Sequence, residues 1–552
     1  MSTHVASDGT QLSDVREVHK PAAPPEQAAP AIGSPPAAEQ PTGRPGGSTG
    51  GSGGWLVPLI VIMVGMFMAV LDISIVNVAV PAIRAEFGAS MDSIQWINTG
   101  YSLTVGVVVP AAAWLGMRFG LRRVYLWSLV LFALASAMCG FAGGLEPLIM
   151  ARIVQGIPGG MLPVVCITIV MRLVPPEKLG AAMGIYGLGV TAAPGAGPML
   201  GGYLVEYVDW RLVFFLNVPI GILGLIAAVL ALPKLPADGA ERFDYLGFGA
   251  IAGSLFSLLL ALEEGPKWGW TSYPTLILLA LGVNLMALFV IVELQVGHPL
   301  LDLRVFTSWQ FDLSMVLITT TSIAFFSTLF YIPSFLQGAQ GLTAFHAGLV
   351  MAPLAAMLMI TNPIIGRLYD RLGPRWLAMA GLLTTATGLL ILSQINVDIS
   401  RAEIILGTSV MCAGLGIGWM PIMTGALASV PTTLAPHASG LNQLIMQVSQ
   451  GLGLAGLAAM VTAQRAQLMA DRAALMAPDG ANADPRILAM QEQGRGGLLG
   501  LWGQVTNQVQ AQTYSNAFLA VAMLVAGGAV LTFFLPSGPP ANTGDATPAA
   551  MH

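Results

Sequence analysis

Long runs of apolar residues, separated by short polar loops, recur along most of this chain. Each run holds about twenty residues, which as a helix crosses the roughly 30 Å hydrocarbon core of a bilayer. The runs do not alternate apolar and polar residues with a period of two, so they predict helices and not the strands of a membrane barrel. The predicted spans lie near 55–77, 94–115, 124–143, 147–172, 180–204, 211–232, 245–263, 274–295, 311–333, 346–366, 376–394, 404–427, 438–463 and 514–535. The pattern therefore predicts an all-α polytopic membrane protein with fourteen transmembrane helices.

The ends of the chain and one loop differ from this pattern. The first 54 residues are rich in Pro, Ala, Gly and Ser and contain no apolar segment typical of a cleaved signal peptide. Such a composition cannot bury enough surface to fold, so we expect disordered tails over residues 1–54 and 537–552. A long polar loop, about Thr462 to Thr513, contains "QRAQLMADRAALMA" and "QVTNQVQAQTY", which predict short amphipathic helical pieces.

Composition agrees with a membrane protein and narrows the classes of partner. Hydrophobic residues make up 55% of the chain and charged residues 9%, whereas soluble domains carry about 25% charged residues. The formal net charge is −5, and the Lys and Arg residues are not concentrated in a basic patch. Nucleic acid is therefore not an expected partner. Cys139, Cys166 and Cys412 lie in apolar spans without C-x-x-C spacing, which is typical of small packing residues.

Lys and Arg are distributed unevenly between the loops of the two sides. If the N-terminus lies inside, the inner loops contain Arg118, Arg122, Arg123, Arg172, Lys178, Lys234, Arg242, Arg304, Arg367, Arg371 and Arg375. The short outer loops contain Arg84, Arg211, Lys267 and Arg401. The positive-inside rule then predicts that both termini are cytoplasmic in a cell inner (cytoplasmic) membrane. The long loop lies outside, either as a polar cap over the outer mouth or as a docking surface for a periplasmic adaptor.

Two inner loops repeat one pattern. "AWLGMRFGLRR" follows the second span and "GRLYDRLGPR" follows the tenth. Aligned without a gap, Leu115, Arg118, Gly120 and Arg122 match Leu368, Arg371, Gly373 and Arg375. Eight spans separate the loops, and an even number of crossings preserves direction, so the pattern predicts two parallel halves. The predicted domains are bundles of six helices at 55–232 and 306–536 (with an outer loop at 464–513) and two additional helices within 233–305.

The repeated loops have two interpretations. Their arginines can pair with acidic groups or helix C-termini across the interface between the halves, which would favour an outward-open state. Alternatively, they only satisfy the positive-inside rule. The Gly-x-x-x-Asp-Arg-x-Gly-x-Arg spacing of the second loop, from Gly366 to Arg375, favours the first interpretation.

The two loops resemble the motif shared by the major facilitator superfamily. More narrowly, "LDISIVNVAVPAI", "ARIVQGIPGG", "GLGVTAAPGAGPMLGGYL" and "DWRLVFFLNVPIG" resemble the fourteen-span drug:proton antiporters of the EmrB/QacA type, over roughly Trp55 to Pro536. The resemblance implies a major facilitator fold with 6+2+6 helices, and energy from the proton gradient with no cofactor. It also allows a periplasmic adaptor (EmrA-like) and an outer-membrane channel as partners, depending on the envelope of the cell. Met117 and Ala113 replace the Asp and Gly of the family motif, and Met446 replaces an arginine found in many relatives.

Asp72 and Arg152 are charged residues deep inside apolar spans. Asp72 lies about seventeen residues, or about 25 Å, from Trp55, and Arg152 lies twenty residues from Arg172. Both therefore lie at a similar depth in the outer half of the membrane, where a charge costs at least about 2.5–3.5 kcal/mol. They are either a fixed ion pair or a titrating carboxylate with a modulating arginine. The family resemblance favours Asp72 as the proton carrier and Arg152 as its modulator.

The fifth span, "GLGVTAAPGAGPMLGG", is rich in glycine and proline. In the family this segment is the antiporter-associated motif at the interface between halves, although ordinary small-residue packing would produce the same composition. The predicted gating residues of this span and the two loops are Arg118, Gly120, Arg122, Gly195, Gly197, Pro198, Gly201, Gly366, Asp370, Arg371, Gly373 and Arg375. At the outer end of the seventh span, Glu263 and Glu264 beside Trp268 and Trp270 predict interfacial anchoring.

Polar and aromatic residues within the spans predict a central cavity beside Asp72. The predicted lining residues are Asn77, Trp96, Asn98, Tyr101, Gln155, Phe326, Phe330, Asn362, Asn442 and Gln443. Such a cavity suits amphipathic or lipophilic toxic compounds, exported in exchange for protons. The alternative is a facilitator-type exporter of one defined solute, such as a siderophore or a lipid precursor. An enzyme is not expected, because the chain has no H-E-x-x-H, G-x-S-x-G or G-x-x-x-x-G-K-[ST] motif.

Overall fold

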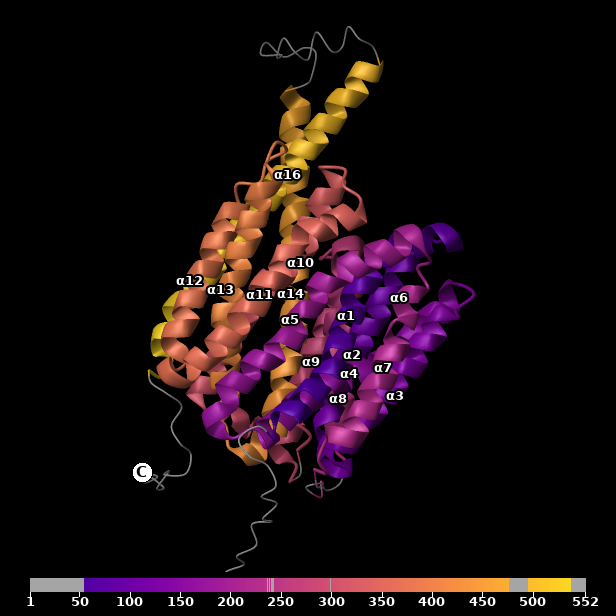
Figure 1. Cartoon of the computed structure of the whole chain (residues 1–552). Helices are drawn as coiled ribbons and strands as arrows, with labels where there is room; N and C mark the ends of the chain where they lie inside the picture. The colour runs from indigo at the N-terminus through magenta and orange to yellow at the C-terminus, as the bar shows by residue number, and fades with distance from the viewer. Residues whose placement is uncertain are drawn as a thin grey trace, which may run out of the picture. The chain divides into compact units, whose positions relative to one another are not determined.

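The computed structural model describes residues 54–475 and 495–537, apart from residues 236, 238, 240–242 and 298. Both predicted tails lie outside the described residues except for their inner ends, Gly54 and Ser537, and so does part of the long loop. Within the described part, the secondary structure is helical and contains no strand (Figure 1).

Among the described residues, fourteen helices are long and apolar enough to cross a membrane, which confirms the predicted number of spans. In the first part of the chain they are α1 (Leu56–Phe87), α2 (Met91–Phe119), α3 (Leu121–Gly140), α4 (Leu145–Leu173), α5 (Leu179–Tyr207), the pair α6 (Leu212–Phe215) and α7 (Asn217–Ala231), α8 (Tyr245–Trp268) and α9 (Tyr273–Gln295). In the second part they are α10 (Trp309–Gly338), α11 (Ala344–Leu372), α12 (Pro374–Leu392), α13 (Arg401–Ala428), α14 (Ala435–Leu475) and α16 (Arg495–Leu531).

Both repeated loops are reduced to a single glycine between two helices. Gly120 has φ +88° and joins α2 to α3, and Gly373 has φ +72° and joins α11 to α12. These left-handed values favour glycine, because a Cβ atom would be strained there. The two loops therefore share one local geometry, as their alignment predicts.

The arginines that follow these glycines bind within their own half. The Nη2 atom of Arg122 donates to the carbonyl oxygen of Val229 near the end of α7, at 2.7 Å. The Nε atom of Arg375 donates to the carbonyl oxygen of Leu535, just beyond α16, at 2.5 Å. Each side chain thus satisfies a helix C-terminus, where a positive charge is favourable. This differs from the expectation that these arginines pair across the interface between the halves.

The helix α5 packs tightly between α11 and α1, as Figure 1 shows. Toward α11, a Cβ atom added to Gly195 would lie 2.0 Å from the Cβ atom of Ala355. Toward α1, a Cβ atom added to Gly197 would lie 1.9 Å from the Oγ atom of Ser74. Both distances are far below van der Waals contact, so the glycines of α5 allow backbone approach on two sides.

The two additional helices lie at one side of the seam between the halves. The helix α8 packs against both α2 and α14, and α9 packs on α8. The side chain of Leu259 on α8 would contact Cβ atoms added to Gly106 of α2 and Gly451 of α14. Small residues on both neighbours therefore seat α8 where the two halves meet.

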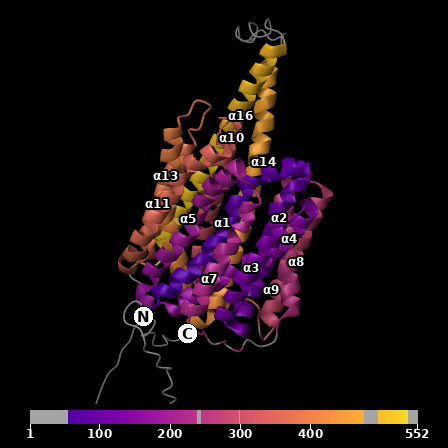
Figure 2. The same cartoon turned by 45° about the vertical axis from the view of Figure 1, so that its right-hand side comes forward.

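The last two spans continue well beyond their membrane segments. The helices α14 and α16 have 41 and 37 residues, and they project together past the ends of the other helices (Figure 2). Asn516 donates to the Oε1 atom of Gln464 at 3.0 Å, and Arg472 donates to Gln508 and Gln512. The expectation of short separate helical pieces is therefore wrong for the described residues, because these polar segments extend the two spans without a break.

Candidate functional site

A cavity of about 420 Å³ lies between the two halves. Its walls come from α1, α2, α4 and α5 of the first half and from α10, α11, α13 and α14 of the second. The lining is mainly apolar, with methionines, aromatic rings and a few amide side chains. A pocket of this size with few polar groups is typical of a site for small organic molecules.

Seven of the ten predicted lining residues face this cavity. They are Asn77, Asn98, Tyr101, Phe326, Phe330, Asn362 and Gln443. The Nδ2 atom of Asn98 donates to the Oδ1 atom of Asn77 at 2.7 Å, which joins α2 to α1 on the cavity wall. The binding of substrate by these residues stays a prediction.

The other three predicted residues do not lie on the cavity wall. Trp96 packs against a cluster of Leu103, Leu259 and Leu260 at the contact with α8. Gln155 is fully buried beside Asp72, as described below. Asn442 is 1% exposed, and its Nδ2 atom lies 3.9 Å from the sulfur of Met446. Their positions depend on the rotation of each helix, which their polarity alone does not reveal.

The sequence prediction also missed polar residues of the cavity wall. Gln447 and Gln450 of α14 face the cavity together with Gln443, and Gln337 of α10 faces it near its end. The spacing of residues 443, 447 and 450 places them on one face of a helix. That periodicity in "NQLIMQVSQ" is the signal that could have found them.

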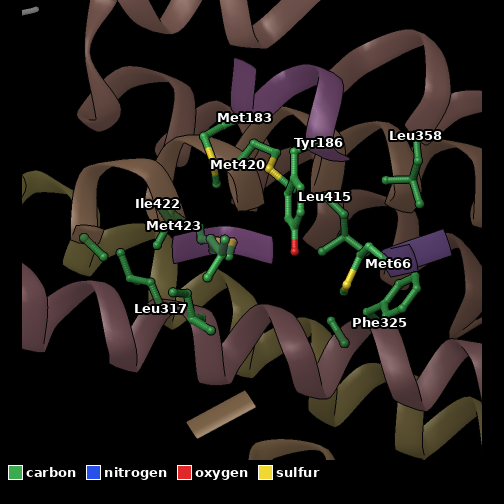
Figure 3. Close-up of a cluster of buried hydrophobic side chains, with 14 of the residues drawn as sticks. Met66, Met183, Tyr186, Leu317, Phe325, Leu358, Leu415, Met420, Ile422 and Met423 are labelled. Atoms are coloured by element: carbon green, nitrogen blue, oxygen red, sulfur yellow. The ribbon is translucent and has the colours of Figure 1, made fainter. Parts of the chain in front are cut away.

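A cluster of buried apolar side chains forms the floor of the cavity, toward the predicted cytoplasmic face. Figure 3 shows Tyr186 in this cluster with Met183 and Met420 beside it and Met66 near Phe325. Flexible methionine side chains adapt to irregular gaps, so a floor built from them can repack. The side chains of this floor that line the cavity are therefore uncharged.

Beyond the floor, one carboxylate joins the two halves. The Oδ1 atom of Asp370 on α11 accepts a hydrogen bond from the backbone N–H of Gly180 in the first turn of α5, at 3.1 Å. Such N–H groups have no partner inside their own helix, and a helix N-terminus favours a negative charge. Next to this bond, a Cβ atom added to Gly366 would lie 3.0 Å from the Cα atom of Gly184. The contact therefore holds α5 and α11 together at the predicted cytoplasmic face.

Asp72 and Arg152 form a buried ion pair, as their depth in the sequence predicts. The Nη1 atom of Arg152 lies 2.5 Å from the Oδ2 atom of Asp72, and the two residues are 1% and 0% exposed. Arg152 also donates to the Oε1 atom of Gln155 at 2.8 Å and to the carbonyl oxygen of Ile97 at 3.3 Å. A pair sealed from water needs such additional hydrogen bonds to offset its desolvation.

Amide side chains from two other places complete the surroundings of Asp72. Its Oδ1 atom accepts from the Nδ2 atom of Asn217 on α7 at 2.8 Å and from the Nε2 atom of Gln155 at 3.0 Å. Both amides also reach the Oγ atom of Ser136 on α3, at 2.9 and 3.2 Å. Sequence reasoning missed Asn217 and Ser136, although Asn217 is a polar residue within the apolar α7. Asp72 is therefore joined to three further helices, α3, α4 and α7.

The Tyr101 ring contacts both this ion pair and the cavity. The Cζ atom of Arg152 lies 4.1 Å from the centre of the Tyr101 ring, and Tyr101 also lines the cavity. A guanidinium over an aromatic face is stabilised by about 2 kcal/mol or more when it is desolvated. The ring thus both holds Arg152 and covers the pair.

Known proteins resemble the chain over most of its length. A family profile described as the Major Facilitator Superfamily matches residues 62–454. The chain is 33% identical over 419 residues to the tetracenomycin C resistance and export protein of Streptomyces glaucescens, which covers 75% of this chain and 77% of that protein. It is 34% identical over 409 residues to the multidrug resistance protein Stp of Mycobacterium tuberculosis (strain CDC 1551 / Oshkosh), covering 74% and 76%.

A solved structure agrees in fold. The proton:xylose symporter XylE, bound to 6-bromo-6-deoxy-D-glucose, superposes with a TM-score of 0.55 at 13% sequence identity. The match covers 87% of this chain and 96% of that one. At this identity the likeness concerns the fold alone, and it confirms the predicted architecture.

Proposed function

This chain belongs to the major facilitator superfamily, and from that premise we propose that it exports amphipathic or lipophilic toxic compounds in exchange for protons carried by Asp72. It is a multi-pass membrane transporter of small molecules and not an enzyme. The direction of transport, the proton coupling and the class of compound are the proposal. The narrower EmrB/QacA type stays a prediction.

The position of the sealed Asp72–Arg152 pair behind the cavity wall carries this proposal. The described side chains that bond to the Asp72 carboxylate, those of Arg152, Gln155 and Asn217, are all donors. Both residues of the pair are buried from water. Proton uptake therefore requires that Tyr101 moves and that Arg152 releases the carboxylate. Gln155 and the carbonyl of Ile97 can hold the guanidinium during that step, because they already accept from it. Rocking of the two halves would supply the movement.

The cavity supports an organic substrate of low charge. Its wall combines apolar side chains with the amides of Asn77, Asn98, Asn362 and Gln443, and methionine-rich surfaces repack around different ligands. The names of the two relatives, a tetracenomycin C exporter and a multidrug resistance protein, support the same class of compound.

The predicted partners and membrane orientation stay predictions. The positive-inside rule supports cytoplasmic termini in the inner membrane. An adaptor of the predicted EmrA type, with its outer-membrane channel, would meet the protein at the projecting ends of α14 and α16, since these lie on the predicted outer side.

A vesicle assay tests the proposal. We expect an imposed pH gradient to drive accumulation of a fluorescent dye in proteoliposomes, and a protonophore to abolish it. Asp72→Asn should remove gradient-driven accumulation while the protein still inserts, because the variant cannot release a proton. Undiminished accumulation by Asp72→Asn would contradict the role of Asp72. Dye transport by the wild type that ignores the gradient would favour the facilitator-type exporter.

A further inference from the structure

Glu263 on α8 is turned toward α2. The hydroxyl groups of Thr99 and Ser102 on α2 lie beside its carboxyl group. Its Oε2 atom is buried and has no hydrogen-bond partner. The neighbouring Glu264 instead pairs with Lys267 at 2.8 Å. The two glutamates predicted as interfacial anchors therefore differ, and Glu263 is a partly buried acid, with one sealed oxygen, that the transport mechanism described above does not use.

A chain of polar side chains connects Glu263 to the central cavity. Gln447 of α14 lines the cavity, and its Nε2 atom donates to the Oγ atom of Ser102 at 3.1 Å. Because Ser102 accepts this bond, its own hydroxyl hydrogen remains available for the Glu263 carboxyl. The path from cavity to carboxyl thus passes through one amide and one hydroxyl group.

The helix α2 stands between two acidic groups. On one side its Ile97 carbonyl and Tyr101 ring contact Arg152 of the Asp72 pair. On the other side, Thr99 and Ser102 face Glu263. These residues span less than two turns, so both acids lie at a similar depth.

The path also crosses the seam between the halves. Gln447 belongs to the second half and Ser102 to the first, while α8 rests against both through Leu259. Movement of α14 relative to α2 would break the Gln447–Ser102 bond. Access of protons to Glu263 would therefore change with the state of the transporter.

We propose that Glu263 is a second proton-binding site, which takes up and releases a proton through Ser102 and Gln447, so that two protons are exchanged for each substrate. Cavity water delivers the proton, which binds the carboxylate to form a neutral carboxylic acid and later returns to water. The ionised group leaves a buried oxygen without a donor, whereas the acid carries its own O–H.

The surroundings of Glu263 suit such a site. The charged side chains that act on it are Glu264 and Lys267 of its own helix, and these two satisfy each other. From α2 the uncharged Thr99 and Ser102 act on it, and Ser102 in turn accepts from the uncharged Gln447 of α14. The one cation among these groups, Lys267, pairs with Glu264, so Glu263 has no ion-pair partner in the described contacts. The inference rests on the proposed proton-coupled export.

The number of protons per substrate tests the proposal. Proteoliposomes receive a fixed gradient of a monovalent cationic dye at zero membrane potential, and the pH gradient that stops net dye flux is measured. With two protons per dye molecule, a tenfold dye gradient should be balanced by a pH difference of about half a unit in the wild type. With one proton per dye molecule, Glu263→Gln should need a pH difference of about one unit. Glu264→Gln, the matched control, should behave as the wild type. Ser102→Ala, which keeps the acid but cuts the path, should behave as Glu263→Gln.

The outcomes separate this inference from the proposed function. If pH has no effect on wild-type dye flux, the proposed proton antiport fails and the second site fails with it. If the wild type is coupled and Glu263→Gln has the same balance point, only the second site is contradicted. If Glu263→Gln does not insert, dicyclohexylcarbodiimide labelling of the wild type decides the question, because this reagent modifies protonated carboxyl groups in apolar sites. We expect an adduct on Glu263 that decreases as pH rises, and its absence at every pH would overturn the inference.

Discussion

Tyr101 is the residue on which separation of the ion pair from the cavity depends. Its ring lies against the Arg152 guanidinium and lines the cavity. Removal of the ring should expose the Asp72–Arg152 pair to cavity water in every state of the transporter. Tyr101→Phe keeps the ring, so it provides a matched control.

We therefore expect Tyr101→Ala to conduct protons without substrate. An acid pulse outside proteoliposomes should acidify the interior several-fold faster than with the wild type, as measured with a trapped pH-sensitive dye. Tyr101→Phe should remain as tight as the wild type. Equal proton entry through the Ala and Phe variants would show that the ring is not the barrier.

The ion pair itself makes a prediction about stability. Arg152→Gln leaves the Asp72 carboxylate buried without its counterion, and such a loss costs about 3–5 kcal/mol. We expect a clear decrease in the Tm of the detergent-solubilised protein. The double variant Asp72→Asn/Arg152→Gln should recover most of that Tm, since it buries no charge, but should not couple transport to protons. A double variant no more stable than Arg152→Gln would contradict a charge-based explanation.

At the scale of elements, α5 packs closely because some of its residues are glycines, whose side chain is a single hydrogen atom. A Cβ atom at Gly197 would overlap the Oγ atom of Ser74 on α1, whereas a Cβ atom at Gly456 on α14 meets nothing within 4 Å. The two glycines therefore form a matched pair for testing whether α5 is an interface or merely contains small residues.

We expect Gly197→Ala to lower the Tm and to slow dye export several-fold, because α1 and α5 must separate to accept the methyl group. Gly456→Ala should leave both quantities unchanged or slightly raised, since alanine favours a helix over glycine. Both are measured on purified protein and in proteoliposomes. Normal export by Gly197→Ala would mean that α5 tolerates a looser contact with α1.

The two halves differ in the contact that closes the predicted cytoplasmic face. In the second repeat, Asp370 accepts from Gly180 at the N-terminus of α5. In the first repeat the aligned residue is Met117, and the facing helix α14 begins with Ala435 and Pro436. Proline has no N–H to donate, so the first repeat lacks the acceptor and one donor of this contact. The Asp370–Gly180 hydrogen bond of the second repeat therefore has no equivalent at Met117 in the first repeat.

Loss of that bond should shift the population of the two transport states. Capping and dipole interactions of this kind contribute about 0.5–2 kcal/mol, so Asp370→Ala should change the ratio of states up to about thirtyfold in favour of the inward-open one. Spin labels at Glu177 and Leu372, which are exposed on either side of the contact, would report the separation of α5 and α11.

The first repeat supplies the control for this measurement. Met117→Asp restores the missing carboxylate but faces a helix start with Pro436, so it should change the separation little. A distance distribution that Asp370→Ala leaves unaltered would show that this hydrogen bond does not determine closure of the face.

For the whole molecule, local sequence determined the number of helices, the repeated loops and the pairing of Asp72 with Arg152. Span length is a local property set by bilayer thickness, and charges deep in apolar spans are so costly that two at one depth are expected to meet. Both conclusions need only distances along the chain.

Only the tertiary structure decided which way each helix faces. Apolar residues surround most membrane helices, because lipid and protein interior are equally apolar, so periodicity does not identify the buried side. Sequence reasoning therefore placed Trp96 and Gln155 on the cavity wall, and it assigned Glu263 to the membrane interface. Helix packing instead turned Trp96 toward α8, enclosed Gln155 with Asp72, and directed Glu263 against α2. The rotation of each helix is set by the shapes of its neighbours, and those neighbours come from distant parts of the chain.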